Sequence, residues 1–392
     1  MFHVFSGLIC LYIVFRLIPA LPWPFAGKCA AALAVLLASQ VHLLNRTFFG
    51  TLASPEAPFA VVAAVGWLFG ALILLAVFLV LKDLGALLFF ALGKATGVRL
   101  SLPIPATWWA GGLTVAALGL SAIGVWQAVR VPEVRAVDIV LDRLPVELDG
   151  LRLVQLSDLH ASRLLAGPWQ REVVDKANAL EPDLILITGD LVDGTPADRA
   201  ADVAPLRDLK ARLGVLAVPG NHEYYSDYVA WMAAFDELGL RLLRNRHVVI
   251  RDQGQALVIA GTTDRNAARF GLPMPDIEAA LAGAPKDAVV LLLAHQPREA
   301  MKNAEAGVDL QLSGHTHGGQ IAGLHFIVQK MNEGFVSGPY RVGAMWLHVS
   351  NGTGLWNGFP VRLGRPSEIT LITLRAASGK TARPPATRAD RR

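Results

Sequence analysis

The sequence predicts a chain of two parts, an N-terminal α-helical transmembrane bundle and a C-terminal α/β unit. Apolar residues make up 53% of the 392 residues, and they are concentrated before Arg130. From Val131 onward, charged residues and prolines appear, and short strand-like runs alternate with helical patterns. Several of these runs end in Asp, Asn or His within polar turns, which is where α/β folds place their functional sites.

Four apolar segments carry the membrane prediction, at residues 4–20, 25–44, 59–81 and 107–128. Each has about the ~20 residues that a helix needs to cross a bilayer. Only a helix satisfies its backbone hydrogen bonds within one such segment. We therefore expect four spans and a membrane anchor over residues 1–129.

The loop charges bear on the orientation of this anchor. Lys28, Lys82, Lys94 and Arg99 follow the first and third segments, with only Asp83 opposing them. The positive-inside rule places these loops in the cytoplasm and the C-terminal unit outside it. No carboxylate or histidine cluster within the segments indicates an ion path. An anchor is favoured, although a transport protein with a regulatory C-terminal domain stays open as an alternative.

The net charge and the cysteine content bear on nucleic-acid binding and on disulfide bonds. The formal net charge is +4, and no basic stripe alternates with aromatic residues, so nucleic acid is not indicated. The two cysteines, Cys10 and Cys29, both lie in apolar segments and indicate no disulfide framework.

The C-terminal unit is expected to begin after a linker at residues 130–136 and to extend over residues 137–375. Strand patterns fall at residues 137–141, 151–156, 184–188, 215–218, 242–250, 256–261, 289–294, 310–313, 346–350 and 368–374. Helical patterns fall at residues 169–180, 201–213, 228–238 and 277–282. The tail at residues 376–392 is polar and basic, which is typical of a disordered segment.

Metal-binding residue types follow five of these strands. They are Asp158 and His160, Asp190, Asn221 with His222, His295, and His315 with His317. Nitrogen and oxygen donors without a thiolate suit Mn, Fe, Zn, Co or Ni. Taken singly, an Asp or Asn here could cap a helix, and His295 could be a core histidine. Because metal-binding residue types follow five separate strands, a metal site is favoured over these alternatives.

In this order, Asp158-x-His160, Gly189-Asp190, Gly220-Asn221-His222-Glu223, His295 and Gly314-His315-x-His317 resemble the five motifs of calcineurin-like metallophosphoesterases. The resemblance implies a metallophosphoesterase sandwich of two mixed sheets flanked by helices. It also implies two divalent metal ions and hydrolysis of a phosphodiester, phosphomonoester or pyrophosphate bond by metal-activated water.

The resemblance assigns roles to individual residues. Asp158, His160, Asp190 and His317 would hold the first ion, and Asp190, Asn221, His295 and His315 the second, with Asp190 as the bridge. His222 resembles the histidine that protonates the leaving oxygen. Asp193 resembles the carboxylate that hydrogen-bonds this histidine, although it could also be a solvated turn residue.

Other features point to a branch of the family. Gly194 follows Asp193, where protein Ser/Thr phosphatases carry Arg. Residues 261–264, 318–320 and 360–362 resemble the bacterial membrane-associated branch, some of whose members act on lipid-linked pyrophosphates such as UDP-2,3-diacylglucosamine. The resemblance implies the bacterial inner membrane, a lipid-linked substrate and contact with membrane lipid. A non-catalytic metal-binding scaffold is the alternative, but it does not need His222 and Asp193.

Overall fold

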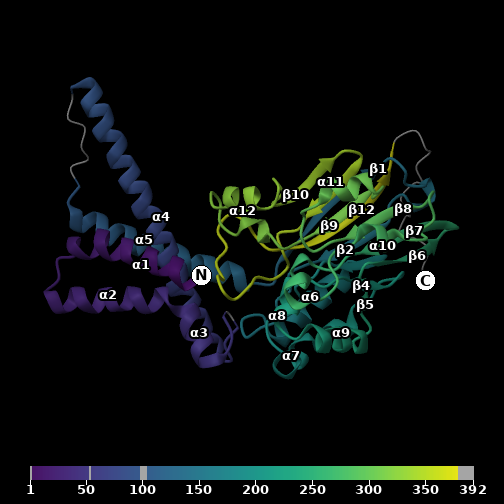
Figure 1. The fold of residues 1–392 in the computed structure, drawn as a ribbon, viewed down its shortest axis with the longest axis horizontal. Helices are drawn as coiled ribbons and strands as arrows, with labels where there is room; N and C mark the ends of the chain where they lie inside the picture. Colours follow the sequence, from purple (N-terminus) through teal and green to yellow (C-terminus); the bar gives the residue numbers. More distant parts are fainter. Residues whose placement is uncertain (1, 53, 98–103, 378–392) are drawn as a thin grey trace, which may run out of the picture. The chain divides into compact units, whose positions relative to one another are not determined.

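The computed structural model describes residues 2–52, 54–97 and 104–377. The chain divides into two compact units (Figure 1). The helical unit comprises Met1–Arg130 and Trp356–Leu363, and the α/β unit comprises Val131–Leu355 and Gly364–Arg392. The tail predicted to be disordered lies outside the described residues from residue 378 onward.

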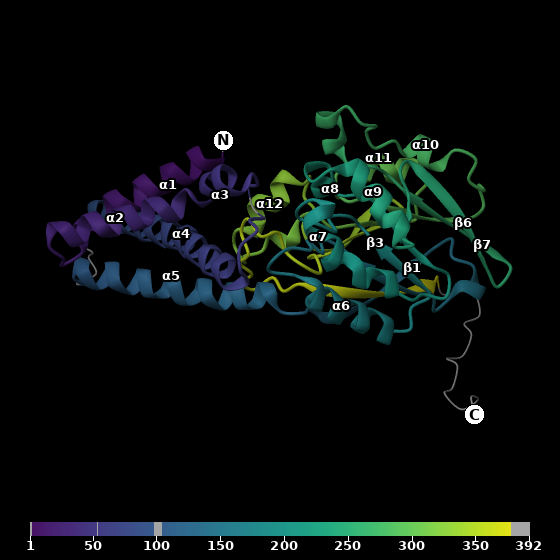
Figure 2. The ribbon, with the colours of Figure 1, turned by 90° about the horizontal axis from the view of Figure 1, so that it is seen from below.

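The helical unit consists of α1 (Phe2–Leu17) with the short η1 (Ile18–Ala20), α2 (Phe25–Ser39), α3 (Val41–Phe49), α4 (Phe59–Thr96) and α5 (Ala106–Val129). Helices α4 and α5 lie side by side (Figure 2). In the described part of the chain, three helical segments are long and apolar enough to cross a membrane: His3–Ala20, α4 and α5. Helices α2 and α3 qualify only as a pair bent by 61°. Four continuous spans are therefore not confirmed.

Helix α4 is longer than the sequence predicts. We expected the span to end at Leu81, before the charged pair Lys82 and Asp83, but the helix continues to Thr96. Asp83 is paired within the helical unit: its carboxylate accepts hydrogen bonds from Tyr12 Oη and Arg16 Nε, both at 2.8 Å. A charge that is paired in this way need not end an apolar helix.

The segment Trp356–Leu363 is a part of the helical unit that the sequence does not predict. Pro360 lies against Gly66, and Val361 lies against Gly70 and Gly124, so closely that a Cβ on any of these glycines would collide with it. The backbone N–H of Arg362 donates to the Gly124 carbonyl at 3.0 Å. The expected domain at residues 137–375 is therefore interrupted by eight residues that pack with the helices.

The first sheet of the α/β unit has the strand order β1-β12-β2-β3-β4-β5. Its strands are β1 (Glu133–Leu141), β2 (Arg152–Leu156), β3 (Leu184–Ile187), β4 (Val215–Ala217), β5 (Arg241–Leu242) and β12 (Glu368–Ala376). Strands β2 to β5 are parallel, whereas β12 runs antiparallel to β2. Since β1 begins at Glu133, the expected linker at residues 130–136 is shorter than predicted.

The second sheet has the order β10-β11-β9-β8-β7-β6. Its strands are β6 (Arg246–Asp252), β7 (Gln255–Gly261), β8 (Val289–Leu293), β9 (Leu310–Ser313), β10 (Gly338–Val342) and β11 (Met345–Val349). The central strands β7, β8, β9 and β11 are parallel, and β6 and β10 pair antiparallel at the two edges. The prediction of two mixed sheets is therefore confirmed.

The main core lies between the two sheets. Leu153, Leu186, Leu291 and Leu312 belong to one cluster of buried side chains from both sheets. A second cluster packs α10 (Ile277–Leu281) and α11 (Ala300–Glu305) on the outer face of the second sheet. The remaining helices are α6 (Gly167–Ala179), α7 (Pro196–Val203), α8 (Asn221–Tyr225), α9 (Tyr228–Glu237) and α12 (His325–Met331).

One helix prediction is wrong in its position. We expected a helix at residues 201–213, but α7 spans Pro196–Val203 and is followed by the 3-10 helix η3 (Ala204–Asp208). Pro205 explains the change, because proline lacks the N–H that a continuing α-helix requires. Thr195 precedes the helix and Pro196 occupies its first turn, which is a favourable position for proline.

Candidate metal centre

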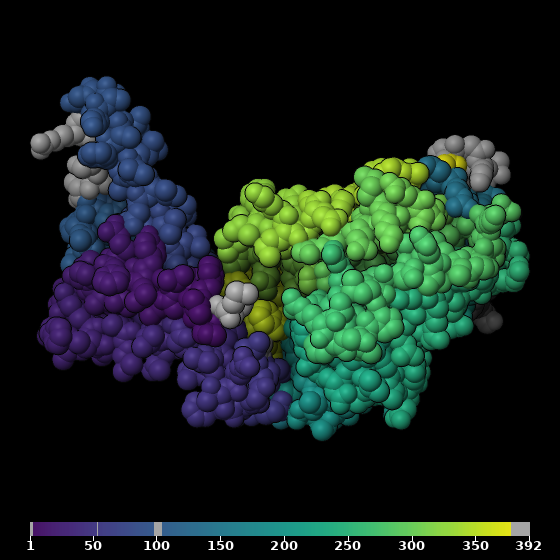
Figure 3. Space-filling view, in the orientation of Figure 1, coloured from purple at the N-terminus to yellow at the C-terminus, as the bar shows by residue number. Residues whose placement is uncertain are grey.

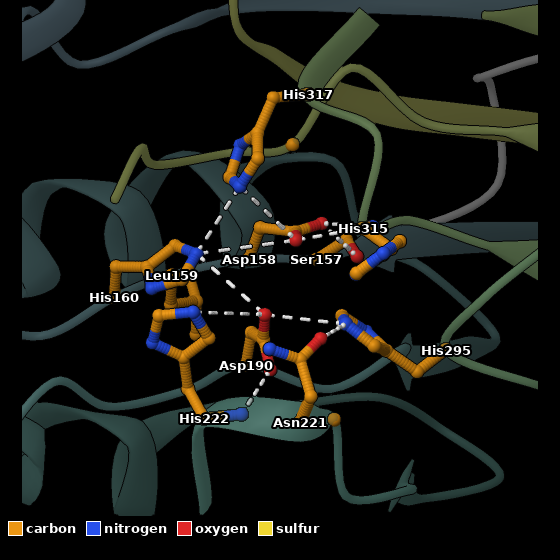
Figure 4. Close-up of polar contacts among 12 residues, drawn as sticks. Ser157, Asp158, Leu159, His160, Asp190, Asn221, His222, His295, His315 and His317 are labelled. Carbon is orange, nitrogen blue, oxygen red and sulfur yellow. Dashed lines mark hydrogen bonds and ion pairs between the residues drawn. The ribbon is translucent and has the colours of Figure 1, made fainter. Parts of the chain in front are cut away.

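The candidate centre is formed where strands of the two sheets end. Asp158 and His160 follow β2, Asp190 follows β3, and Asn221 and His222 follow β4. From the second sheet, His295 follows β8, and His315 and His317 follow β9. Figure 4 shows their side chains pointing toward one another. Parallel strands bring their carboxyl ends to the same edge, which is why residues so distant in sequence meet.

Two groups of donors stand out. In the first, donor atoms of Asp158, His160 and His317 all lie within 4.8 Å of one another, and the same holds for Asp190, His295 and His315 in the second. His160 Nε2 and His317 Nε2 are 3.3 Å apart. In the second group, His295 Nε2 lies 3.2 Å from Asp190 Oδ2, and it also lies 3.1 Å from Oδ1 of the nearby Asn221.

Asp190, a member of the second group, also lies close to His160 of the first group. Its Oδ2 is 3.2 Å from His295 Nε2 and 3.8 Å from His160 Nε2. Its Oδ1 accepts a hydrogen bond from the backbone N–H of His222 at 2.8 Å, which fixes the orientation of the carboxylate. A carboxylate held in this way presents oxygen to both donor groups.

These side chains fit divalent metal ions. Two ligands about 2.1 Å from one ion in tetrahedral geometry are themselves roughly 3.4 Å apart, close to the separations found here. Asp158, His160, Asp190 and His295 are buried, and three further carboxylates nearby, Asp193, Glu223 and Asp264, are buried as well. So much negative charge away from water requires positive partners, which cations would supply.

Without a cation, histidines compensate this charge. Burial raises the pKa of Asp190, but His295 and His222 outweigh burial and hold the pKa well below its usual range. Burial likewise lowers the pKa of His295, but Asp190 raises it well above the ordinary value. Ligand histidines must be neutral to bind a metal, so metal uptake would release protons from this cluster.

His222 and Asp193 form a second feature of the centre. Asp193 Oδ1 lies 2.5 Å from His222 Nδ1 and 3.1 Å from His160 Nδ1. Burial lowers the pKa of His222, but Asp190 and Asp193 outweigh this and raise it to about 9. The side chain of His222 is 16% exposed, whereas that of His160 is fully buried. His222 is therefore the more exposed of the two histidines that Asp193 contacts.

The backbone around the centre is strained. Asp158, His160, Asp190, His315 and His317 all have positive φ, between 44° and 68°. Left-handed backbone costs a residue with a Cβ roughly 1–2 kcal/mol, and such strain is concentrated at functional sites. Five of the seven predicted ligands share it, so the fold holds these residues against their local preference.

Two glycines allow the loops to approach one another. A Cβ on Gly314 would collide with Ser157 and with the carboxylate of Asp158. A Cβ on Gly220 would collide with Asp190. These positions explain why the motifs around His315 and Asn221 contain glycine.

Sequence reasoning missed Glu223 and Ser157. Glu223 is fully buried and accepts hydrogen bonds from the backbone N–H groups of Asp190 (3.2 Å), Leu191 (2.6 Å) and Gly220 (2.7 Å). Ser157 Oγ donates to Asp158 Oδ2 at 2.6 Å. Glu223 stands in the motif Gly220-Asn221-His222-Glu223 and Ser157 precedes Asp158, and these positions were the signal in the sequence.

A buried polar network continues beneath the centre. Thr188 Oγ1 donates to Ser157 Oγ at 2.7 Å, and Gln155 Nε2 donates to Thr188 Oγ1 at 3.1 Å. His348 Nδ1 lies 2.8 Å from Gln155 Oε1. The Thr188 carbonyl also lies 2.8 Å from His295 Nδ1. His348 therefore belongs to the buried network that supports the centre.

The two tyrosines after the third motif differ. Tyr224 is buried and stacks on Tyr228, with ring centroids 4.2 Å apart. Tyr225 is half-exposed, and its ring centroid lies 5.4 Å from that of His222. Tyr224 therefore packs, and Tyr225 borders the centre.

Comparisons with known proteins identify relatives of this chain. The family model described as calcineurin-like phosphoesterase matches residues 151–319. A transmembrane protein with metallophosphoesterase domain from Bos taurus is 37% identical over 270 residues, covering 66% of this chain and 60% of the relative. An uncharacterized metallophosphoesterase of Helicobacter pylori is 34% identical over 265 residues, covering 67% of this chain and 69% of the relative. A further relative, the uncharacterized metallophosphoesterase YkuE of Bacillus subtilis, is 32% identical over 244 residues, covering 60% of this chain and 82% of the relative.

The fold and the donor groups define a metal-binding α/β sandwich. The relatives identify its family, and the chain belongs to the calcineurin-like metallophosphoesterases. The match spans about 60% of the length of the Bos taurus protein.

Proposed function

We propose that the chain is a membrane-anchored, dinuclear metal-dependent phosphoesterase. The observation that carries the proposal is the position of Asp190 Oδ2, which lies 3.2 Å from His295 Nε2 and 3.8 Å from His160 Nε2. An oxygen between two groups of donors suits a carboxylate shared by two ions. Family membership makes hydrolysis of a phosphate ester the expected reaction.

The donors divide between two sites. Asp158, His160, His317 and Asp190 would hold one ion, and Asp190, Asn221, His295 and His315 the other. Bound divalent ions supply Lewis acidity, which polarises a phosphoryl oxygen and lowers the pKa of water. The donor set admits Mn, Fe, Zn, Co or Ni.

The catalytic residues of the chain itself are His222 and Asp193. The imidazole of His222 is partly exposed, Asp190 and Asp193 raise its pKa, and in its protonated form it can donate a proton to the leaving oxygen. Asp193, whose Oδ1 lies 2.5 Å from His222 Nδ1, fixes the ring so that Nε2 is the donating nitrogen. The same carboxylate favours the charged form of the ring, because it stabilises a positive partner.

The proposal also includes a membrane anchor, a location, an orientation and a class of substrate. The apolar segments of the helical unit act as the anchor, with α2 and α3 together as a fourth, bent span. The resemblance to the bacterial membrane-associated branch supports the bacterial inner membrane as the location. The loop charges support a position of the α/β unit outside the cytoplasm. An amphiphilic, lipid-linked phosphate ester such as UDP-2,3-diacylglucosamine is the substrate class that agrees with an anchored enzyme.

The test uses the full chain, purified in detergent, stripped of metal with a chelator and reloaded with one ion at a time. Hydrolysis is compared on an aryl phosphodiester, an aryl phosphomonoester and a lipid-linked nucleotide pyrophosphate. We expect activity to depend on the restored ion and to be lost in Asp190→Asn. A folded, metal-loaded chain that hydrolyses none of these esters would contradict the proposal and favour a metal-binding scaffold.

A further inference from the structure

Helix α12 (His325–Met331) follows the metal-ligand turn and has an unusual surface. Its sequence, His-Phe-Ile-Val-Gln-Lys-Met, contains four apolar residues, yet none of the seven is buried among the residues that the structure describes. Phe326 is 64% exposed, Ile327 60% and Met331 64%. Figure 3 shows the yellow-green spheres of this part of the chain at the surface. Large apolar side chains that gather on one short helix mark an interaction surface.

Backbone and polar contacts hold the helix in place instead of apolar burial. At its start, the backbone of His325 lies so close to Gly319 that a Cβ on this glycine would collide with it. At its end, Arg298 Nη2 donates to the Met331 carbonyl at 2.5 Å, and Asn332 is buried and donates to the Val328 carbonyl at 2.9 Å. The apolar side chains are therefore not needed to attach the helix to its own domain.

The arrangement of these residues resembles that of a helix at a membrane interface. Phe326, Ile327, Lys330 and Met331 fall within roughly 140° of the helix circumference, because each residue turns the helix by about 100°. Lys330 is exposed on this face, where its ammonium group can reach a lipid phosphate while its stem stays in apolar surroundings. Apolar side chains with lysine on one face of a helix are typical of binding to anionic lipid.

We propose that α12 rests on the bilayer surface, with Phe326, Ile327 and Met331 at the boundary between headgroups and acyl chains. The same chain carries helices long and apolar enough to cross a membrane, so lipid is the apolar partner available to this face. The helix adjoins His317 and Gly319 of η5, and its lipid contact therefore lies close to the candidate metal centre. If the proposed hydrolase activity holds, this contact would deliver the phosphate of an amphiphilic substrate to the metals.

The test places a probe on α12 of the full chain. Cys10 and Cys29 are replaced by alanine, Ile327→Cys is introduced, and the thiol is labelled with a fluorophore sensitive to its surroundings. The protein is reconstituted into vesicles of phosphatidylcholine and phosphatidylglycerol with brominated acyl chains, which quench fluorophores in the bilayer. The matched control is Val229→Cys on α9, because Val229 is 71% exposed and α9 lies far from α12 in Figure 1.

We expect quenching at residue 327 to exceed that at residue 229 by about two-fold or more. Phe326→Cys repeats the measurement at a second position, and retention of the buried Cys10 provides a second background if the double replacement impairs folding. Equal, weak quenching at residues 327, 326 and 229 would overturn the proposal and assign the surface to a protein partner.

A kinetic experiment links the contact to function. The double variant Phe326→Ser, Ile327→Ser should raise the apparent KM for a lipid-linked pyrophosphate in vesicles. It should leave hydrolysis of a soluble aryl phosphodiester unchanged. The control variant Val229→Ser should leave the hydrolysis of both substrates unchanged. An unchanged KM on the lipid substrate would overturn the delivery role. Failure of the proposed activity would appear separately, as wild-type protein that hydrolyses no ester while quenching at residue 327 persists.

Discussion

Oδ1 of Asp193 lies 2.5 Å from Nδ1 of His222. The same oxygen lies 3.1 Å from Nδ1 of His160, whose Nε2 faces His317 in the first donor group. Asp193 therefore contacts the proposed leaving-group histidine and a proposed metal ligand at once. Because of this double contact, we expect substitutions of His222, Asp193 and Asp190 to differ in their effects on turnover and on metal binding.

Replacement of His222 by Ala should remove turnover and leave the metals. We expect kcat to fall by about 10²–10⁴-fold, the usual contribution of a general acid. Metal content, measured by mass spectrometry of the purified protein, should match the wild type. Metal loss as complete as that of Asp190→Asn would contradict the assignment of His222 as an acid and make it a ligand.

Replacement of Asp193 by Asn should lower both metal affinity and kcat. The substitution keeps the size of the side chain but removes the charge that orients His160 and His222. Loss of a group that orients a ligand costs about 10–100-fold in metal affinity or activity. We expect reduced affinity in a metal titration together with a lower kcat. A lower kcat with wild-type metal affinity would show that the contact with His160 is dispensable.

Replacement of Asp190 by Asn should abolish metal binding at both sites together. An amide lacks the negative charge that a shared ligand supplies, and Asp190 Oδ2 lies 3.2 Å from His295 Nε2 and 3.8 Å from His160 Nε2. Asp236→Asn, at an exposed position on α9, is the control. Retention of one full equivalent of metal by Asp190→Asn would argue against a bridging carboxylate.

Replacement of Gly314 by Ala should distort the centre through packing alone. The added methyl group would collide with Ser157 and Asp158, and overpacking costs about 1–3 kcal/mol. We expect a lower thermal unfolding midpoint and weaker metal binding. Gly111→Ala is the control, because among the described residues no atom outside its chain neighbours and its own helix backbone lies within 4 Å of the Cβ that it would add. Unchanged metal affinity in Gly314→Ala would show that the loop can move away.

His348 should make stability depend on pH. Burial lowers its pKa to about 4, whereas the pKa in an unfolded chain is about 6.5. Between these values only the unfolded chain binds the proton. The stabilisation is therefore complete above about pH 6.5 and is lost as pH falls toward 4.

His348→Gln should weaken this dependence. The difference in pKa corresponds to at most roughly 3 kcal/mol. The measurement is the thermal unfolding midpoint of the variant and the wild type at several values of pH between 4 and 7. His247→Gln, at a half-buried position on β6, is the matched control. Parallel curves for wild type and His348→Gln would exclude a proton-linked role for His348.

Much of the α/β unit was predictable because its signals are local. Strands such as Leu184–Ile187 and Leu310–Ser313 are short apolar runs that end in polar turns, and they form as expected. The extension of α4 past Asp83 was not predictable, because the partners of that carboxylate, Tyr12 and Arg16, lie in another helix. The packing of Trp356–Leu363 with the helices was not predictable for the same reason, because Gly66 and Gly124, which it contacts, are remote in sequence.

The sequence by itself determined which donors the candidate centre has and in what order they appear, because a strand followed by a polar turn is encoded within a few residues. Their division into two groups was implied only by the family resemblance, and the tertiary structure alone decided the distances within each group. His315 and His317 are separated by one residue, yet His317 lies with Asp158 and His160, and His315 lies with Asp190 and His295. The pairing of strands across two sheets sets these distances, and both histidines have left-handed backbone, which departs from the strand geometry that would place them on one face.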